Sequence, residues 1–305
     1  HQRVVIREEG AELVFDLERG EGELSIRQLK VQDQESTAFI TLNLKPGEVG
    51  CSFQGELTSR NRDRLLATNH FFKGRIAGDL NLQLFKDHLA DSRAEGKLTI
   101  SDFSYLPVSG KVLVIEEALL EGRGNAVEIK SAAMRLLDEP MKLKGTMTAG
   151  ESRLLLDWQI QAQGLDWDRL QDENHLGHLG TTVFGGTAGD GMKFLGIPLG
   201  GTLRLQADHL TLAHFTWQPF WATFTLAPDG VTVDITRSNL CTIPTPAKLI
   251  PHPTGSVLII NPAARNLDLD ATLDCLFDRK GTLTGVFDLD GELTTTLRSE
   301  RTIET

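Results

Sequence analysis

The sequence is poor in cysteine, in aromatic residues and in positive charge. Its 305 residues include three cysteines and one tyrosine, and 31 Lys and Arg stand against 42 Asp and Glu, giving a formal net charge of -11. Three cysteines are too few for a disulfide-rich scaffold, and Cys51, Cys241 and Cys275 lack the spacing of zinc ligands. An acidic surface repels phosphate backbones at long range, so the composition predicts no nucleic-acid partner.

Long hydrophobic runs are also missing. No run reaches the ~18 to 20 apolar residues that cross a bilayer, and no signal peptide opens the chain, which predicts a soluble protein. Because the sequence begins with His1 rather than Met, we expect an excised fragment whose targeting or anchoring segment is not included.

Catalytic signatures are missing as well. The sequence contains neither a G-x-S-x-G elbow nor an H-E-x-x-H helix. The glycine-rich "GTAGDGMKF" has Met192 after Gly191, where a phosphate-binding loop requires lysine, so a flexible connector is the favoured interpretation. His175 and His178 form an H-x-x-H pair, which we attribute to chance among eight histidines. We therefore predict no enzyme, no cofactor and no metal.

The feature that does recur is alternation of apolar and polar residues, typical of strands with one buried face. In "GESRLLLDWQIQAQG", residues 150–164, apolar side chains occupy the even positions 154–162. Similar patterns run from Leu13 to Cys275, so we predict a mainly β protein. In "LDLDATLD" the acids Asp268, Asp270 and Asp274 fall between leucines, which predicts the solvated face of a strand, with a weak surface calcium site as the alternative.

Turns, short helices and domain boundaries can also be predicted from the sequence. Gly78, Gly96 and Gly201 each precede an apolar pair, which predicts a bend where a strand leaves a turn. A hairpin is predicted around Pro228–Gly230 and another at 278–281, and short helices after Thr58 or Ser59 and after Leu165. The predicted domains are a first β block at 1–170, a glycine-rich loop or hinge at 171–200 and a second β block at 201–305.

Two segments resemble the C-terminal region of AsmA-like proteins of the bacterial envelope. The positions that carry the resemblance are, in the first segment, Phe53, Gly55, Leu57, Thr58, Asp63, Arg64 and Leu65 and, in the second, Asp229, Gly230, Val231, Leu240, Cys241, Ile243, Thr245 and Pro246. The alternation of apolar and polar residues extends the likeness over most of the chain. The sequence departs from the family at Thr242 and Ala247, where glycine is usual, which puts the local turn geometry in question.

The resemblance implies a periplasmic body anchored to the inner membrane through a segment outside this sequence. It also implies a long antiparallel sheet curled into an open apolar groove that binds phospholipid acyl chains and helps to move lipids between the inner and outer membranes. An oxidising periplasm would allow a disulfide between Cys241 and Cys275. The side chains expected to contact lipid are Leu80, Leu82, Leu84, Leu98, Ile100, Leu154, Leu156, Trp158, Ile160, Leu203, Leu205, Val231, Val233, Ile235, Leu267, Leu269 and Leu273.

Two alternatives stay open. Every apolar stripe could face a second sheet in a closed β-sandwich. The protein could also be a non-catalytic structural or assembly module that binds other envelope proteins through its sheet edges or its acidic surface. An enzyme acting on envelope glycans is a remote third possibility.

Overall fold

The computed structural model describes residues 2–8, 11–20, 23–32, 36–58, 72–105, 113–172, 184–185, 192–194, 196–252, 255–277 and 283–298. The chain divides into two compact units, His1–Trp158 and Gln159–Thr305. Twenty strands belong to one large, mostly antiparallel sheet that is not closed, and β20 and β21 form a small second sheet. The mainly β prediction is confirmed, and a closed sandwich is not what these residues form.

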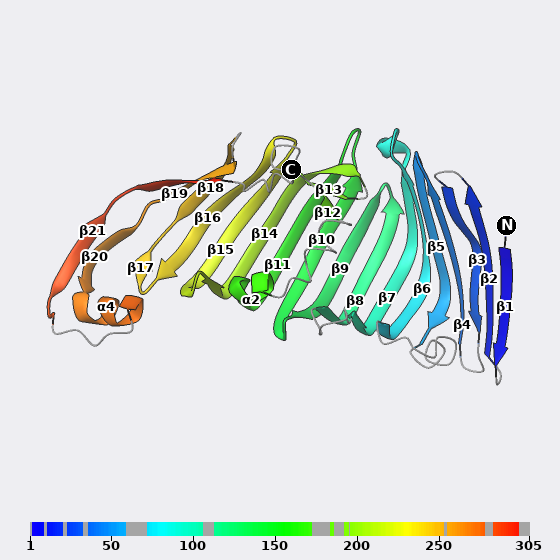
Figure 1. Cartoon of the computed structure of the whole chain (residues 1–305), viewed down its shortest axis with the longest axis horizontal. Helices are drawn as coiled ribbons and strands as arrows, with labels where there is room; N and C mark the ends of the chain where they lie inside the picture. The colour runs from blue at the N-terminus through cyan, green and yellow to red at the C-terminus, as the bar shows by residue number, and fades with distance from the viewer. Residues whose placement is uncertain are drawn as a thin grey trace, which may run out of the picture. The chain divides into compact units, whose positions relative to one another are not determined.

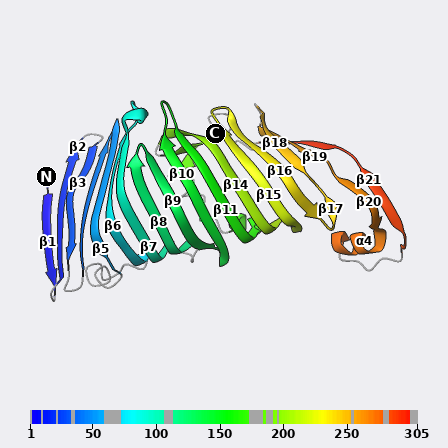
Figure 2. The same cartoon turned by 180° about the vertical axis from the view of Figure 1, so that it is seen from behind.

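Unit 1 is a meander of long strands. From β1 to β10 each strand pairs antiparallel with the next one along the chain, and the two opposite views show these strands side by side in chain order (Figure 1, Figure 2). Its elements are β1 (Gln2–Glu8), β2 (Ala11–Gly20), β3 (Glu23–Gln32), β4 (Thr37–Lys45), β5 (Glu48–Leu57), β6 (Phe72–Phe85), the 3-10 helix η1 (Leu89–Asp91), β7 (Arg93–Tyr105), β8 (Leu113–Gly124), β9 (Ala126–Leu136), β10 (Glu139–Ala149) and the start of β11 (Leu154–Asp166).

Unit 2 continues with antiparallel pairing and adds two short helices. Strand β11 pairs with β14, β14 with β15, β15 with β16, β16 with both β17 and β18, β18 with β19, and β19 with β22. After β11 its elements are α2 (Trp167–Asp172), β12 (Phe184–Gly185), β13 (Lys193–Phe194), β14 (Ile197–Leu212), β15 (Phe215–Ala227), β16 (Gly230–Leu240), β17 (Ile243–Pro244), β18 (Ala247–His252), β19 (Gly255–Ile260), β20 (Ala263–Asp268), α4 (Leu269–Phe277), β21 (Val286–Asp290) and β22 (Leu293–Arg298).

Several local predictions can be compared with these elements. The hairpin around Pro228–Gly230 is confirmed, because Ala227 pairs with Gly230 where β15 turns into β16, and α2 confirms the helix after Leu165. Between 171 and 200 the described residues form the ends of α2 and the short strands β12 and β13, and β14 begins at Ile197. The helix predicted after Thr58, the hairpin at 278–281 and the pair His175 and His178 lie outside the described residues.

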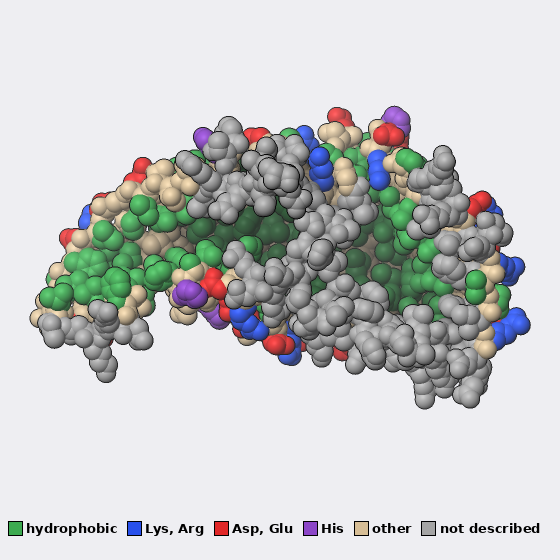
Figure 3. Space-filling view, viewed as in Figure 1, with side chains coloured by type: hydrophobic (Ala, Val, Ile, Leu, Met, Phe, Trp, Pro, Cys, Tyr) green, Lys and Arg blue, Asp and Glu red, His purple; other side chains and the backbone are tan. Residues whose placement is uncertain are grey.

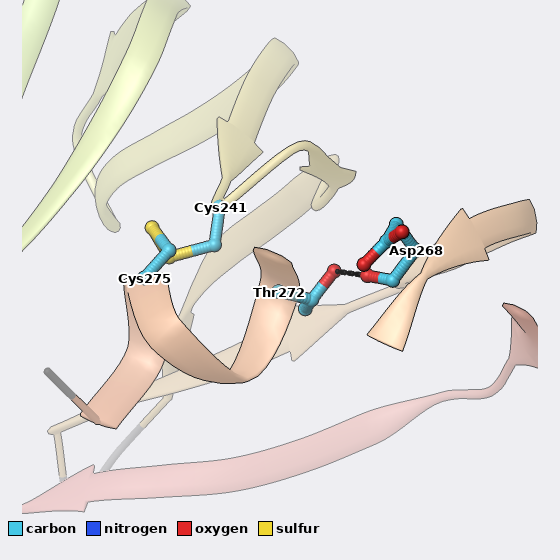
Figure 4. Close-up of a disulfide and its surroundings, with 4 residues drawn as sticks. All are labelled: Cys241, Asp268, Thr272 and Cys275. Carbon is cyan, nitrogen blue, oxygen red and sulfur yellow. Dashed lines mark hydrogen bonds between the residues drawn. A yellow bond between two sulfur atoms is a disulfide. The ribbon is translucent and has the colours of Figure 1, made fainter. Parts of the chain in front are cut away.

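The prediction of a strand through Leu267–Cys275 is wrong beyond Asp268. Strand β20 ends there and Leu269–Phe277 is the helix α4. Asp268 caps the helix, since its Oδ1 accepts a hydrogen bond from the Ala271 amide at 2.9 Å and its carbonyl oxygen accepts one from Thr272 Oγ1 at 2.7 Å (Figure 4). Leu269 and Leu273 are also spaced for one face of a helix, so the pattern suits both structures.

A disulfide between Cys241 and Cys275 connects α4 to the turn that follows β16 (Figure 4). The two Cα atoms are 5.6 Å apart across a sequence separation of 34 residues. Cys51 is the remaining, free thiol. The connection holds α4 beside the large sheet although β20 and β21 are paired only with each other.

Three of the glycines that precede apolar pairs, Gly78, Gly96 and Gly201, do not mark strand entries, which corrects the turn interpretation at these positions; Gly22 and Gly110, which precede similar pairs, lie outside the described residues. Gly78 and Gly96 lie inside β6 and β7, and Gly201 lies inside β14. Gly78 and Gly96 have φ values of 144° and 105°, and a β-carbon there would lie 2.1 Å from Lys97 O and 1.9 Å from Asp79 O. Two neighbouring strands thus approach each other at positions that a larger residue would force apart.

We predict that Gly78→Ala and Gly96→Ala each lower the free energy of unfolding by about 2 kcal/mol or more, because each adds a clash to an unfavourable φ. Urea denaturation followed by circular dichroism measures the loss. Gly291→Ala is the control, since a β-carbon at Gly291 would meet nothing within 4 Å. Equal stability of all three variants would contradict the close approach of β6 and β7.

Helix α2 is fastened to the β14–β15 turn by Asp168. Its carboxylate accepts hydrogen bonds from the Ala213 amide at 2.7 Å and the His214 amide at 2.8 Å, in a turn where both residues have positive φ. The bond from the His214 amide is the main reason that the pKa of Asp168 lies below its usual value, and the Ala213 amide lowers it further. The ionised carboxylate therefore stabilises this turn.

We expect Asp168→Asn to lower the melting temperature of the protein at neutral pH. Because the folded-state pKa is lowered, the stabilisation by Asp168 is complete above the ordinary carboxyl pKa of about 4 and is lost as the pH falls through the lowered value. Thermal melts of the wild type and the variant from pH 7 to pH 3 measure the difference. A difference that grows toward low pH would contradict the assigned role.

Candidate functional site: the apolar face of the sheet

The register of unit 1 places apolar residues of neighbouring strands on one shared face. Directly paired residues point to the same side of a sheet, and Leu80 on β6 pairs with Phe53 on β5, which pairs with Ile40 on β4. Leu98 on β7 pairs with Gly78 of β6 and Leu120 of β8. We call this side the apolar face of unit 1.

The apolar face carries no charged side chain in the segments where the register is regular. These positions hold Ala, Val, Ile, Leu, Phe, Gly and the free Cys51, which pairs with Leu42 and Leu82. They are Ala38, Ile40, Leu42 and Leu44 on β4; Val49, Cys51, Phe53, Gly55 and Leu57 on β5; Ile76, Gly78, Leu80, Leu82 and Leu84 on β6; Ala94, Gly96, Leu98 and Ile100 on β7; and Ala118, Leu120 and Gly122 on β8.

Many large side chains of this face remain partly accessible to solvent. Leu82, Leu98, Ile100 and Leu120 are half-buried, whereas the small Ala94, Ala118 and Ala132 beside them are buried. Both strands of the second sheet, β20 and β21, belong to unit 2. Within unit 1 the described contacts join strands that are neighbours or next neighbours in the sheet, apart from η1, which contacts β6 and β10. These contacts are mainly those between paired strands of one sheet.

The 3-10 helix η1 buries a leucine and contacts strands that are not neighbours in the sheet. Leu89 is 1% exposed, and η1 contacts both β6 and β10 although three strands separate them. The loop is held in place by Ser92, whose Oγ accepts a hydrogen bond from the Phe85 amide at 3.0 Å. Sequence reasoning missed Leu89, because a single leucine between charged residues has no periodicity.

The opposite face of unit 1 is polar and carries ion pairs between adjacent strands. Arg75 donates to Glu56 at 2.7 Å, and this hydrogen bond lowers the pKa of Glu56. Burial raises the pKa of Glu121, but the hydrogen bond from Arg123 and the charges of Lys97 and Lys130 outweigh it and the pKa is lowered. Exposed pairs of this kind add little stability, and they identify this face as the solvated one.

Strand β11 confirms the alternation of apolar and polar residues that was predicted for residues 154–162. Leu154 and Leu156 are buried and Trp158 and Ile160 half-buried, whereas residues 155, 157, 159, 161 and 163 are exposed. A β-carbon at Gly145 of β10 would lie 2.9 Å from Trp158 Cδ1, so Trp158 lies on the same side as Gly145. Gly145 pairs with Ile129. The even side of β11 within unit 1 thus belongs to the apolar face.

Unit 2 has an apolar face of its own. Leu205 pairs with Ala222, Ala222 with Ile235 and Ile235 with Ala247. The neighbouring row runs from Leu203 through Phe224, Val233, Leu249 and Leu258, and Val231 pairs with Leu226. On the other side, the exposed Trp221 lies under the guanidinium of Arg237, whose Cζ is 4.8 Å from the ring centroid. The sheet of unit 2 is therefore apolar on one side in these strands, like the sheet of unit 1.

In unit 1, Figure 3 shows hydrophobic side chains gathered over β6–β8, and in unit 2 it shows them over β14–β16. Charged side chains are seen mainly near the strand ends, and the hydrophobic groups lie recessed between them. The two units thus share a surface pattern, an apolar centre with a polar margin.

Of the predicted lipid-contacting residues, the structure brings most together within the two units. Leu80, Leu82, Leu84, Leu98 and Ile100 share the apolar face of unit 1 with Leu154, Leu156 and Trp158, and Leu203, Leu205, Val231, Val233 and Ile235 share that of unit 2. Ile160 follows on β11 in unit 2. Leu267, Leu269 and Leu273 do not join either face, because Leu267 pairs with Phe287 in the small sheet and the other two lie on α4.

Sequence reasoning also left out residues that belong to these faces. Ile40, Leu42 and Leu44 showed the alternating pattern and could have been included. Leu258 lies in "SVLII", where all residues of β19 are half-buried, so period-two reasoning gives no preferred side. Leu249 lies in β18, where Lys248, Ile250 and His252 are exposed, so the alternation could have placed it.

The two apolar faces offer hydrophobic contact to whatever lies against them. Among them no group of three or more His, Cys, Asp or Glu is arranged to hold a metal ion, and none of their helices has the length and hydropathy of a membrane span. Trp158 Nε1 is buried and has no hydrogen-bond partner in the part of the chain that is described. Burial raises the pKa of Cys51, so its thiol stays protonated on the apolar face.

Comparison with models of known protein families and with curated protein sequences finds no match for this chain.

We predict that Cys51 reacts slowly with a water-soluble maleimide at neutral pH, because burial keeps the thiolate fraction below that of an ordinary thiol with a pKa near 8.5. The rate should continue to rise at pH values where glutathione has levelled off. Mass spectrometry of the adduct over time measures it, with the protein unfolded in urea as control. A native rate equal to the unfolded rate would show that Cys51 is not shielded.

Proposed function

We propose that the apolar face lines an open groove that holds the acyl chains of phospholipids while their headgroups stay in water. The protein is then a non-catalytic lipid-binding body that helps to move lipids between two membranes. The observation that carries this proposal is the set of half-buried leucines and isoleucines that share one face of the sheet, while the ion pairs between strands lie on the other face. Hydrocarbon is the ligand that such a wall accepts without any specific polar contact.

The energetics favour a conduit. Each methylene exposed to water costs about 0.8 kcal/mol, so a lipid that crossed an aqueous gap unaided would lose most of what the bilayer gives it. A wall of Leu, Ile and Val offers the chains surroundings close to those of the bilayer. Entry and exit are then nearly balanced, which lets a lipid pass through rather than remain trapped.

The placement in the cell belongs to the same proposal. The resemblance to AsmA-like proteins at Phe53, Gly55 and Leu57 and at Asp229–Val231 supports a periplasmic body, attached to the inner membrane by an anchor outside this sequence. Gly55 has a φ of 107°, and a β-carbon there would lie 2.1 Å from Thr37 O. A glycine at this position is therefore required by the close approach of β4 and β5.

Mass spectrometry of lipids released from the purified, folded protein tests the proposal directly. We expect phospholipids with intact acyl chains to be released in a ratio that does not depend on the detergent used. A protein that carries no lipid, and that takes none up from phosphatidylethanolamine vesicles, would contradict the proposal.

A matched pair of variants on β4 separates groove from fold. Ile40 is half-buried on the apolar face, and its neighbour Phe39 is 38% exposed on the opposite face. We predict that Ile40→Asp reduces bound phospholipid severalfold, because a carboxylate must give up water to stand beside the chains, while Phe39→Asp leaves it unchanged. Lipid per protein is measured by mass spectrometry, with circular dichroism as a check of folding. Equal lipid content in both variants would contradict the assignment of faces.

A structural or assembly role is the second candidate, and one observation favours it. The described edge strand β1 pairs with β2 on one side only, and Val4 and Val5 on it are exposed. Such an edge can add a strand from another protein. This role predicts no bound lipid and an apolar face that stays shielded from hydrocarbon probes.

A further inference from the structure

The segment after the large sheet exposes more apolar surface than it can cover by itself. Strands β20 and β21 pair only with each other, and α4 lies between them in the chain. Phe277 at the end of α4 is 63% exposed, Leu283 57% and Val286 65%, and we call these three residues the C-terminal patch. Figure 3 shows hydrophobic side chains gathered over α4, β20 and β21.

The patch is presented by a fixed scaffold. The Leu269 amide donates a hydrogen bond to Gly285 O at 2.9 Å, which ties the start of α4 to the segment between Leu283 and Val286. Val286 pairs with Asp268. The disulfide at Cys275, two residues before Phe277, fastens the other end of α4 to the turn after β16. A two-stranded sheet is marginally stable alone. Here the helix between its two strands, α4, is fixed at both ends by the hydrogen bond at Leu269 and the disulfide at Cys275.

The charges around the patch define what can cover it. Over 263–293 the sequence has seven acidic residues, Asp268, Asp270, Asp274, Asp278, Asp288, Asp290 and Glu292, against three basic residues, Arg265, Arg279 and Lys280, so the segment is acidic on balance. Arg265 is already paired with Asp290 at 3.2 Å. A second copy of this chain would bring the same acids together, and an anionic membrane would be repelled as well.

We propose that the C-terminal patch is a docking site for an amphipathic protein segment that carries apolar and basic side chains. Phe277 and Val286 supply the apolar contact, since large exposed hydrophobic patches on soluble proteins mark interaction sites. The surrounding carboxylates pair with the basic groups and fix the orientation of the segment. The site lies outside the apolar faces of the sheet, so it does not depend on lipid binding.

The probe for this site is a short helix-forming peptide of leucine and lysine, with a leucine and glutamate peptide of equal length for comparison. Binding to the whole chain is followed by fluorescence anisotropy at low and at physiological salt. We expect the lysine peptide to bind, its affinity to fall with salt, and the glutamate peptide not to bind. The double variant Phe277→Ser/Val286→Ser should lose about tenfold or more in affinity.

Two controls keep the result specific. Leu155→Ser removes an exposed leucine from β11 at no change in charge, and it should leave the affinity unchanged. Glu292→Gln should weaken binding of the lysine peptide severalfold. The double variant keeps every charge, so a loss of binding there is not a general electrostatic effect. Circular dichroism of each variant checks that the fold is intact.

Four outcomes would overturn the proposal. One is unchanged affinity in Phe277→Ser/Val286→Ser, and another is equal binding of the glutamate peptide. If the wild type binds phosphatidylcholine vesicles and the double variant does not, the patch is a membrane contact instead. If sedimentation shows a concentration-dependent dimer of the wild type and none of the double variant, the patch binds a second copy of the chain instead.

Discussion

The constraint on which the structure depends is the two-residue period of its strands, which sends apolar side chains to one face and charged ones to the other. In unit 1 the register keeps this separation across β4–β8, so that Ile40, Phe53 and Leu80 form one row while Glu56 and Arg75 meet on the other side. A one-residue slip would reverse both faces at once. A face of this kind must be covered by protein or by another apolar partner.

Glycine inside the strands lets the sheet keep that separation while neighbouring backbones come close. Gly78 and Gly96 stand on the apolar face opposite Leu98 and Leu80, at positive φ. Small and large residues thus alternate across β6 and β7 on this face.

Much of the fold could be predicted from sequence, because alternation is a local property. The strand at 154–166 and the hairpin at Pro228–Gly230 follow from neighbours alone. Helix α4 could not be distinguished from a strand, since Leu269 and Leu273 satisfy both periods and the Asp268 cap decides. The mid-strand role of Gly78 depends on a strand that lies elsewhere in the chain. Thr242 has a φ of 72°, a conformation that glycine adopts without strain, and neighbours in the sequence do not reveal it.

The central claim is that hydrocarbon lies against the apolar face, and quenching of a fluorophore on β5 tests it most directly. A bimane group on the free Cys51 reports from the apolar face, and the same group on Ser52→Cys in a Cys51→Ser background reports from the opposite face of the same strand. When phospholipid with a nitroxide on its acyl chain is added, the account predicts strong quenching at position 51 and little at position 52. Equal quenching at both positions, or none at position 51, would contradict it.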